Sequence, residues 1–106
     1  MTFFQYACQN GYSQIVNILT QKSIEFNIDL NAKDGNGLTA FHHGCVNGHP
    51  KIAEILIQKS SEFNIDLNAV TNSGKTAFNL ACFWNVNNIV DIMMKYAKAY
   101  KIDCTK

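Results

Sequence analysis

Three histidines and one cysteine lie close together near the middle of the chain, and their side chains are the first candidates for chemistry. They are His42, His43, Cys45 and His49. Imidazole nitrogen and thiolate sulfur are ligands that zinc prefers, and a closed zinc site needs four ligands in tetrahedral placement. On a helix, two ligands share a face only at a spacing of three or four residues, and His42 with Cys45 is the only such pair in the helix expected over residues 39–47. The spacing therefore favours structural roles, and we expect no metal site.

No other pattern in the sequence is typical of catalysis. The eight acidic residues are scattered and offer no pair suited to general acid and base work. The two glycines of the Gly35–Gly37 segment flank an asparagine, which suits a tight turn rather than a phosphate-binding loop. We therefore predict that the protein is not an enzyme and has no catalytic residue and no cofactor.

Three of the four cysteines recur at a fixed interval. Cys8, Cys45 and Cys82 are 37 residues apart. If the interval reflects stacked helical units, equivalent positions lie roughly 10 Å apart, which is too far for a disulfide. We expect these cysteines to be small buried apolar side chains. Unpaired cysteines indicate a reducing compartment, so we expect the cytoplasm, with the nucleus as the alternative.

The same interval separates two nearly identical segments. Residues 21–32 read QKSIEFNIDLNA and residues 58–69 read QKSSEFNIDLNA, so that eleven of twelve positions agree at an offset of 37. Identity this dense indicates tandem duplication, and a period in this range predicts stacked repeats. We expect a single array over residues 1–106, with repeat 1 at about 2–34, repeat 2 at about 35–71 and repeat 3 at about 72–106.

Each predicted repeat contains two apolar stretches with helical spacing. The first stretch follows a threonine that suits the N-cap position, and it ends at a residue that tolerates a left-handed backbone. The threonines are Thr2, Thr39 and Thr76, and the terminating residues are Gly11, Gly48 and Asn85. Two short helices joined by so short a turn must pack antiparallel.

The charge pattern argues against several classes of partner. The net charge is +1, all nine basic residues are lysines, and no basic run occurs. Without arginine or a basic stretch, the chain lacks the electrostatic footprint of a nucleic-acid-binding protein. No apolar run is long enough to span a membrane. We therefore expect no nucleic acid, no membrane and no small-molecule substrate among the partners.

The repeating residues resemble the ankyrin repeat. The matching segments are a turn and helix start at Asp34–His42, a Gly-His turn at Asn47–His49, a second helix at Ile52–Leu56 and a connection at Asp66–Ala69. The resemblance covers nearly the whole chain in three registers. It implies an all-α fold, namely an ankyrin-type α-solenoid of helix–turn–helix units linked by β-hairpin-like loops.

Each repeat is four residues longer than the usual ankyrin unit, which carries a structural expectation. In the second repeat the excess falls between Leu56 and Asp66. Because four residues are about one helical turn, we predict a longer second helix in each repeat. We place the end of that helix near Phe63, with Asn64 as a left-handed terminator.

The histidine that usually opens the first ankyrin helix occurs in only one of the three repeats. His42 occupies this position in the second repeat, whereas Gln5 and Asn79 replace it in the first and third. We therefore expect a side-chain amide to make the hydrogen bond to the capping threonine in those two repeats.

The resemblance also implies a function and a binding surface. In ankyrin arrays the hairpin tips and first helices line a concave groove that binds another protein, so we predict a protein–protein interaction module. Carried over position by position, the partner-binding residues are Gln9, Asn10, Gly35, Asn36, Leu38, Val46, Asn47, Asn72, Ser73, Lys75, Phe83 and Trp84. Trp84 has an alternative role, in which it packs beneath a neighbouring repeat, because tryptophan is usually largely buried.

Two other functions fit the same residues. The closing helix is as apolar as its internal counterparts, whereas a terminal repeat usually has a polar outer face. The chain is then a passive scaffold segment of a longer array, with further ankyrin repeats beyond its termini or another subunit covering its end. Asn31 and Asn68 also resemble the site that asparaginyl hydroxylases modify in ankyrin repeats, so hydroxylation at these two residues is a further hypothesis.

Overall fold

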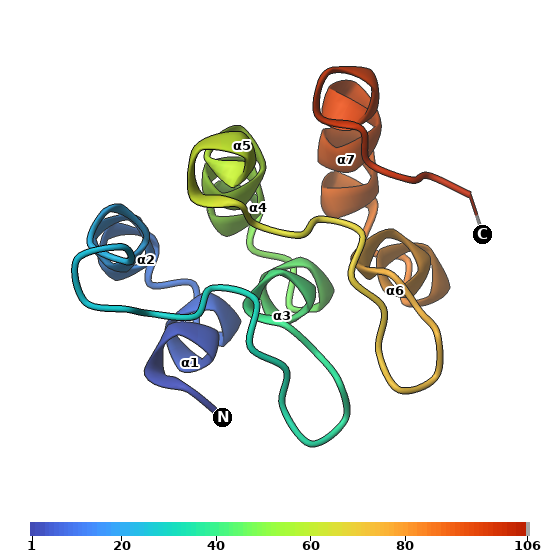
Figure 1. The fold of residues 1–106 in the computed structure, drawn as a ribbon. Helices are drawn as coiled ribbons and strands as arrows, with labels where there is room; N and C mark the ends of the chain where they lie inside the picture. The colour runs from blue at the N-terminus through green and yellow to red at the C-terminus, as the bar shows by residue number, and fades with distance from the viewer. Residues whose placement is uncertain (106) are drawn as a thin grey trace.

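Three helix pairs stack side by side in the protein. The computed structural model describes residues 1–105, which contain seven helices and no strand. Figure 1 shows the helices in two rows, with the loops before α3 and α6 projecting on the same side. The first row contains α1 (Phe3–Gln9), α3 (Ala40–Val46) and α6 (Ala77–Phe83). The second row contains α2 (Ser13–Gln21), α4 (Pro50–Gln58) with α5 (Ser60–Phe63), and α7 (Asn87–Tyr100).

This arrangement confirms the predicted all-α solenoid. The predicted end of repeat 3, residue 106, lies outside the described residues. None of the helices within residues 1–105 is both long enough and apolar enough to cross a membrane.

Each helix of the first row begins with a reciprocal cap. The threonine side chain accepts a hydrogen bond from the backbone N–H three residues later, and the side chain at that later position accepts from the threonine N–H. Gln5 Oε1 lies 2.7 Å from Thr2 N, and Asn79 Oδ1 lies 3.0 Å from Thr76 N. The prediction that amides replace the histidine contact in these repeats is therefore confirmed.

A left-handed residue follows each helix of the first row. Gly11, Gly48 and Asn85 have φ values of 76°, 74° and 57°. This backbone conformation stops the helix and turns the chain back within two residues. The predicted helix ends are therefore confirmed, and α1, α3 and α6 each pack against the following helix.

The predicted burial of the three regularly spaced cysteines is confirmed in the first two units only. Cys8 and Cys45 are fully buried, and burial raises the pKa of the Cys8 thiol to about 12 and that of Cys45 also well above its usual range. Cys82 is only half-buried, so the expectation is wrong at this residue. The physical reason is that, within residues 1–105, no further unit packs on the outer side of α6.

The outer face of the third helix pair is apolar and uncovered. Ala53 and Ile57 in α4 are fully buried. The residues 37 positions later in α7 are Val90, which is half-buried, and Met94, which is 60% exposed. In the second helix pair these two positions are covered by the third pair. The third pair keeps apolar residues there, although within residues 1–105 no further helix pair covers them.

The predicted extension of the second helix is continuous only in the third unit, where α7 runs for 14 residues. In the second unit α4 stops and the separate helix α5 begins after Lys59, while in the first unit residues 22–27 form turns. The prediction of one long helix in each repeat is therefore wrong for two of them. The extensions nevertheless end alike, at left-handed residues Asn27, Asn64 and Lys101, which includes the predicted terminator.

A serine explains where the extension is interrupted. Ser23 and Ser60 each donate a side-chain hydrogen bond of 2.7 Å to the carbonyl three residues earlier. Such back-bonding competes with the helical backbone pattern. The third unit has Ala97 at the same position, and alanine is the best helix former.

Exchanging the residues at these positions should move the interruption. We expect Ser60→Ala to join α4 and α5 into one helix, because the competing hydroxyl is removed. The reverse change, Ala97→Ser, should interrupt α7 near Tyr96. Backbone NMR chemical shifts of Lys59 and Tyr96 measure both effects, and unchanged shifts at Lys59 in the first variant would contradict this explanation.

The hairpin loop before α6 is fixed against the loop before α3. Asn72 N donates to Asn36 O at 3.2 Å, and Asn72 Nδ2 donates to Gly35 O at 3.1 Å. Gly37 has a φ of 82°, and a Cβ there would lie 2.6 Å from Asn72 N, so glycine allows both the turn and the close approach. This contact holds the loop before α6, which forms part of the candidate site, against the loop before α3.

Candidate functional site

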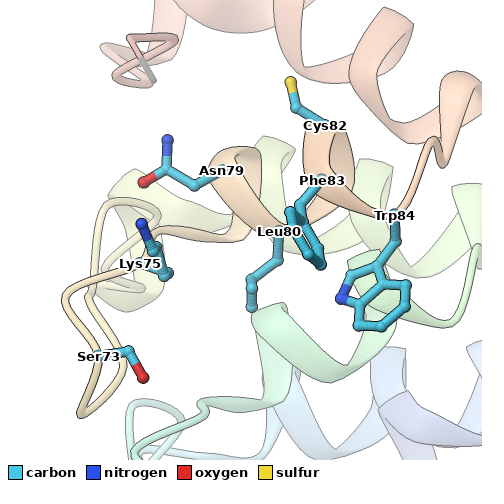
Figure 2. Close-up of a pocket in the computed structure, with 7 residues that line it drawn as sticks. All are labelled: Ser73, Lys75, Asn79, Leu80, Cys82, Phe83 and Trp84. Atoms are coloured by element: carbon cyan, nitrogen blue, oxygen red, sulfur yellow. The ribbon is translucent and has the colours of Figure 1, made fainter.

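A pocket of about 460 Å³ lies between the hairpin loop of residues 71–75 and helix α6. Its polar end and its apolar end are distinct, as Figure 2 shows. The polar end contains Ser73, Lys75 and Asn79, and the apolar end contains Leu80, Phe83 and Trp84. Cys82 also lines the pocket, but its sulfur points away from the two rings. The pocket thus joins one cationic side chain to a group of exposed apolar ones.

Short-range hydrogen bonds hold the polar end in place. Thr71 Oγ1 accepts from the backbone N–H groups of Ser73 and Lys75, both at 3.3 Å, which closes the hairpin. Asn79 is occupied at both ends of its amide, since Oδ1 accepts from Thr76 N and Nδ2 donates to Thr105 O at 2.8 Å. The loop and the start of α6 therefore form a rigid frame for the pocket.

The aromatic pair at the end of α6 is exposed to solvent. Phe83 is 73% exposed and Trp84 is 62% exposed. Their ring centroids are 5.0 Å apart and the ring planes are nearly perpendicular, which is a favourable edge-to-face contact. The alternative that Trp84 packs beneath a neighbouring repeat is wrong. Asn47, which is 37 positions earlier, is also exposed although a unit follows it, so this position faces away from the stack.

The structure brings four of the twelve predicted partner-binding residues into the pocket, namely Ser73, Lys75, Phe83 and Trp84. The other eight do not line it, although each is exposed or half-buried: Gln9, Asn10, Gly35, Asn36, Leu38, Val46, Asn47 and Asn72. Asn10 and Asn47 donate their side-chain amides to the carbonyls of Tyr6 and His43, which completes their own helix ends. Trp84 occupies the same position without an amide, so its side chain is free of that structural role.

Sequence reasoning missed three residues of the pocket, namely Asn79, Leu80 and Cys82. Asn79 was assigned only to the cap, and Cys82 only to the core. A signal for Leu80 existed, since it shares its position with Tyr6, which is exposed on α1. The repeat register therefore identifies Leu80 as a residue of this surface.

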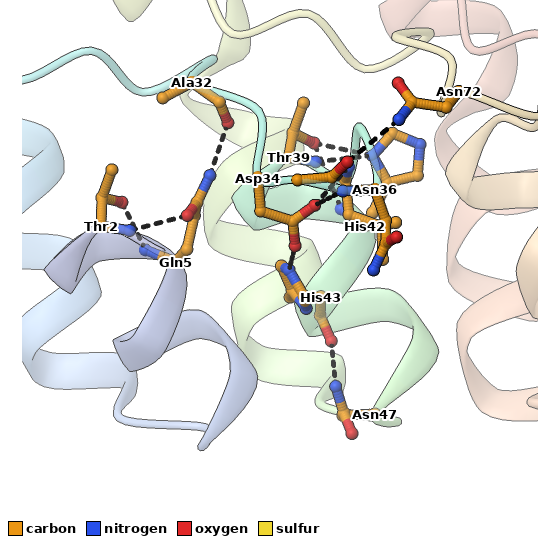
Figure 3. A network of polar contacts seen from close by, with 12 residues as sticks. Thr2, Gln5, Ala32, Asp34, Asn36, Thr39, His42, His43, Asn47 and Asn72 are labelled. Atoms are coloured by element: carbon orange, nitrogen blue, oxygen red, sulfur yellow. Dashed lines mark hydrogen bonds and ion pairs between the residues drawn. The ribbon is translucent and has the colours of Figure 1, made fainter.

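The histidines of the central cluster point to three different neighbours rather than to one another. His42 contacts Thr39 and the Lys75 carbonyl, His43 contacts Asp34, and His49 Nε2 lies 2.8 Å from Gln9 O. Figure 3 shows the contact of His42 with Thr39 and that of His43 with Asp34. Within residues 1–105 no group of three or more His, Cys, Asp or Glu side chains is placed to hold a metal ion. The contacts assign these histidines to connections within and between units.

The His43–Asp34 contact joins a hairpin to its helix. His43 Nε2 lies 2.7 Å from Asp34 Oδ2, and both side chains are largely buried. Partial burial would raise the pKa of the Asp34 carboxyl, but hydrogen bonds from Leu38 N, His43 and Asn36 N outweigh it and lower that pKa. Asp34 therefore stays ionised and fixes the first hairpin against α3.

Comparison with known proteins supports the repeat assignment. A family model described as ankyrin repeats (3 copies) matches residues 4–106. The chain is an ankyrin repeat protein. Ankyrin repeats are generally protein–protein interaction modules, and the family is non-catalytic. A search of curated proteins finds no match.

Asn31 and Asn68 connect successive units of the ankyrin array. The Asn31 amide donates to Asn64 O and accepts from Asp66 N, each at 2.8 Å. Asn68 repeats this pattern with Lys101 O and Asp103 N. Both side chains thus have a structural role, and their hydroxylation stays a prediction.

His42 gives the ankyrin array a dependence on pH. Burial lowers the pKa of His42 below its ordinary value of 6.5. The nearby carbonyls of Lys75 and Ala69 oppose this shift. His42 Nδ1 accepts from Thr39 N at 3.0 Å, and only an unprotonated ring nitrogen can accept. The folded protein therefore favours the neutral ring.

We expect the free energy of unfolding to fall as the pH drops below about 6.5 because the unfolded chain then binds the His42 proton more readily. The matched control is His42→Gln, since Gln5 makes equivalent contacts to Thr2 N and Ala32 O without titrating near this pH. Urea unfolding between pH 7 and pH 5 should show a flatter dependence in the variant. Parallel curves for the two proteins would show that another group is responsible.

Proposed function

We propose that this ankyrin array is a non-enzymatic module that binds a protein partner through the hairpin loops and the exposed side of α1, α3 and α6. The observation that carries the proposal is the exposed Phe83–Trp84 pair beside a formed pocket. Tryptophan is among the residue types most enriched in binding hot spots. The twelve residues proposed from the repeat register remain the candidate interface.

The proposal has an energetic basis. Covering a large apolar side chain contributes about 1.5–3 kcal/mol, and the edge-to-face contact restricts the two rings before a partner arrives. The partner therefore gains apolar contact with little ordering cost in this module. The neighbouring polar groups of Ser73, Lys75 and Asn79 suit a rim around that contact.

Replacing the aromatic pair by its counterparts from the second repeat tests the proposal. The variant Phe83→Val with Trp84→Asn copies Val46 and Asn47, which the fold already accommodates at the same positions. We expect partner binding to weaken at least about 30-fold because loss of about 2 kcal/mol corresponds to that factor. Affinity capture with the array as bait, followed by titration of the captured protein, provides the measurement.

A second variant controls for the loss of exposed apolar surface as such. Ile24→Ser removes an exposed apolar side chain from the first unit and copies Ser61. It should leave partner capture unchanged. If the aromatic variant keeps its helical circular dichroism and still captures the same protein with the same affinity, the proposed interface is wrong.

A scaffold segment of a longer array is a second candidate function, and the uncovered outer face of the third unit favours it. Val90 and Met94 occupy positions that are fully buried in α4. We propose that a further ankyrin-type helix pair stacks on this face. This function is compatible with partner binding because Asn47, the counterpart of Trp84, stays exposed although a unit packs on the second helix pair.

Extending the array tests the second candidate. A copy of residues 33–69 appended after residue 106 continues the repeat register. It should raise the free energy of unfolding because Met94 and its neighbours become covered, and Met94→Glu should remove most of that gain. Urea unfolding of the extended chains, with and without the substitution, measures the effect. An equal stability of the original and extended chains would contradict stacking on this face.

A further inference from the structure

We infer that the partner segment bound in the α6 pocket is an acidic-hydrophobic one, with an Asp or Glu carboxylate close to a large apolar side chain. The inference deepens the proposed function and rests on it. It is carried by the chemistry of the two ends of the pocket, which call for different groups on the partner.

The polar groups left free around the pocket are hydrogen-bond donors. Within residues 1–105, Ser73 Oγ, Lys75 Nζ and Trp84 Nε1 have no hydrogen-bond or ion-pair partner, whereas Asn79 is satisfied at both ends. A lysine ammonium and an indole N–H can only donate. In Figure 2 the indole nitrogen lies on the side of the ring that faces Leu80 and Phe83. The partner must therefore supply acceptors.

The charge at the pocket selects an anionic acceptor. Among the residues of 1–105 that line it, Lys75 is the one charged residue, and none of them has a carboxylate. Asp34, on the neighbouring hairpin, is engaged by His43 and by two backbone N–H groups. The charge of Lys75 is thus left for a partner, and a carboxylate gives a charge-assisted hydrogen bond.

The apolar end selects a side chain rather than a small molecule. Leu80, Phe83 and Trp84 offer an apolar surface, but the two aromatic rings remain mostly exposed, so the pocket does not enclose its occupant. Small-molecule sites bury most of the ligand surface. A protein segment can cover the rings from outside while placing one apolar side chain between them and Leu80.

A stacked helix pair would leave this end of the pocket accessible. The counterparts of Phe83 and Trp84 are Val46 and Asn47, which stay half-buried and exposed although the third unit packs on the second. The counterpart of Asn79 is His42, which is fully buried. The counterpart of Cys82 is Cys45, which is also fully buried. An added unit would therefore cover Asn79 and Cys82 and leave the aromatic pair for a partner.

Selection from a phage-displayed library of random dodecapeptides tests the inference. The complete chain is immobilised, and the Phe83→Val, Trp84→Asn variant serves for counter-selection. We expect the enriched peptides to combine an acidic residue with a nearby Leu, Phe, Tyr or Trp. Failure to enrich any peptide over the counter-selected pool overturns both the inference and the proposed function.

Titration of one enriched peptide, labelled with fluorescein, measures how much Lys75 and the aromatic pair each contribute to binding. Lys75→Leu copies the counterpart Leu38 and should weaken binding about two- to fivefold, with a smaller salt dependence. A peptide with the amide in place of the carboxylate should lose the same factor, and it should bind the wild-type and Lys75→Leu proteins equally. The aromatic double variant should weaken binding at least about 30-fold.

Two results separate failure of the inference from failure of the proposed function. In the first result, the enriched peptides require Phe83 and Trp84 but show no preference for an acidic residue, and they bind Lys75→Leu as well as wild type. This result contradicts the inference of an acidic partner but leaves the proposed interface intact. Peptides that bind the aromatic double variant with unchanged affinity overturn both. Circular dichroism of each variant establishes that its helices are intact.

Discussion

One hydrogen-bonded position in each unit joins the start of its first helix to the loop that follows its second helix. The third residue of each first-row helix bonds its own capping threonine and also a backbone carbonyl in that loop. Gln5 donates to Ala32 O, His42 lies 3.2 Å from Lys75 O, and Asn79 donates to Thr105 O. A buried polar group is costly without a partner, so helix start and loop placement depend on each other. Gln, His and Asn all satisfy this constraint because each of these side chains offers both a donor and an acceptor.

This constraint separates positions that carry the fold from positions that are free to vary. Cys8 and Cys45, which lie inside the stack, are fully buried. The last residues of the first-row helices face away from the stack, so Val46 and Asn47 in one unit correspond to Phe83 and Trp84 in the next. Side chains that do not take part in stacking are therefore free to serve a function. In the third unit these are the exposed aromatic residues Phe83 and Trp84.

The 37-residue repeat register predicted much of the local structure of each first helix. The threonine caps, the left-handed ends at Gly11, Gly48 and Asn85, and the amide substitutes follow from local backbone chemistry. The interruption of α4 is also local, since it depends on Ser60 rather than Ala97, but the four-residue excess alone gave no sign of it. The exposure of Cys82 depends instead on whether another unit packs against α6. The spacing of the cysteines along the sequence gives no information on this.

The sequence by itself determined the repeat and the boundaries of the first helix in each unit, because caps, turns and apolar spacing act over a few neighbouring residues. Only the tertiary structure decided that Lys75 on a hairpin and Leu80 on α6 line the same pocket. It also decided that Trp84 is exposed and that Asp34 is engaged by His43. These outcomes depend on the distance between separate elements, which is fixed by how the units pack.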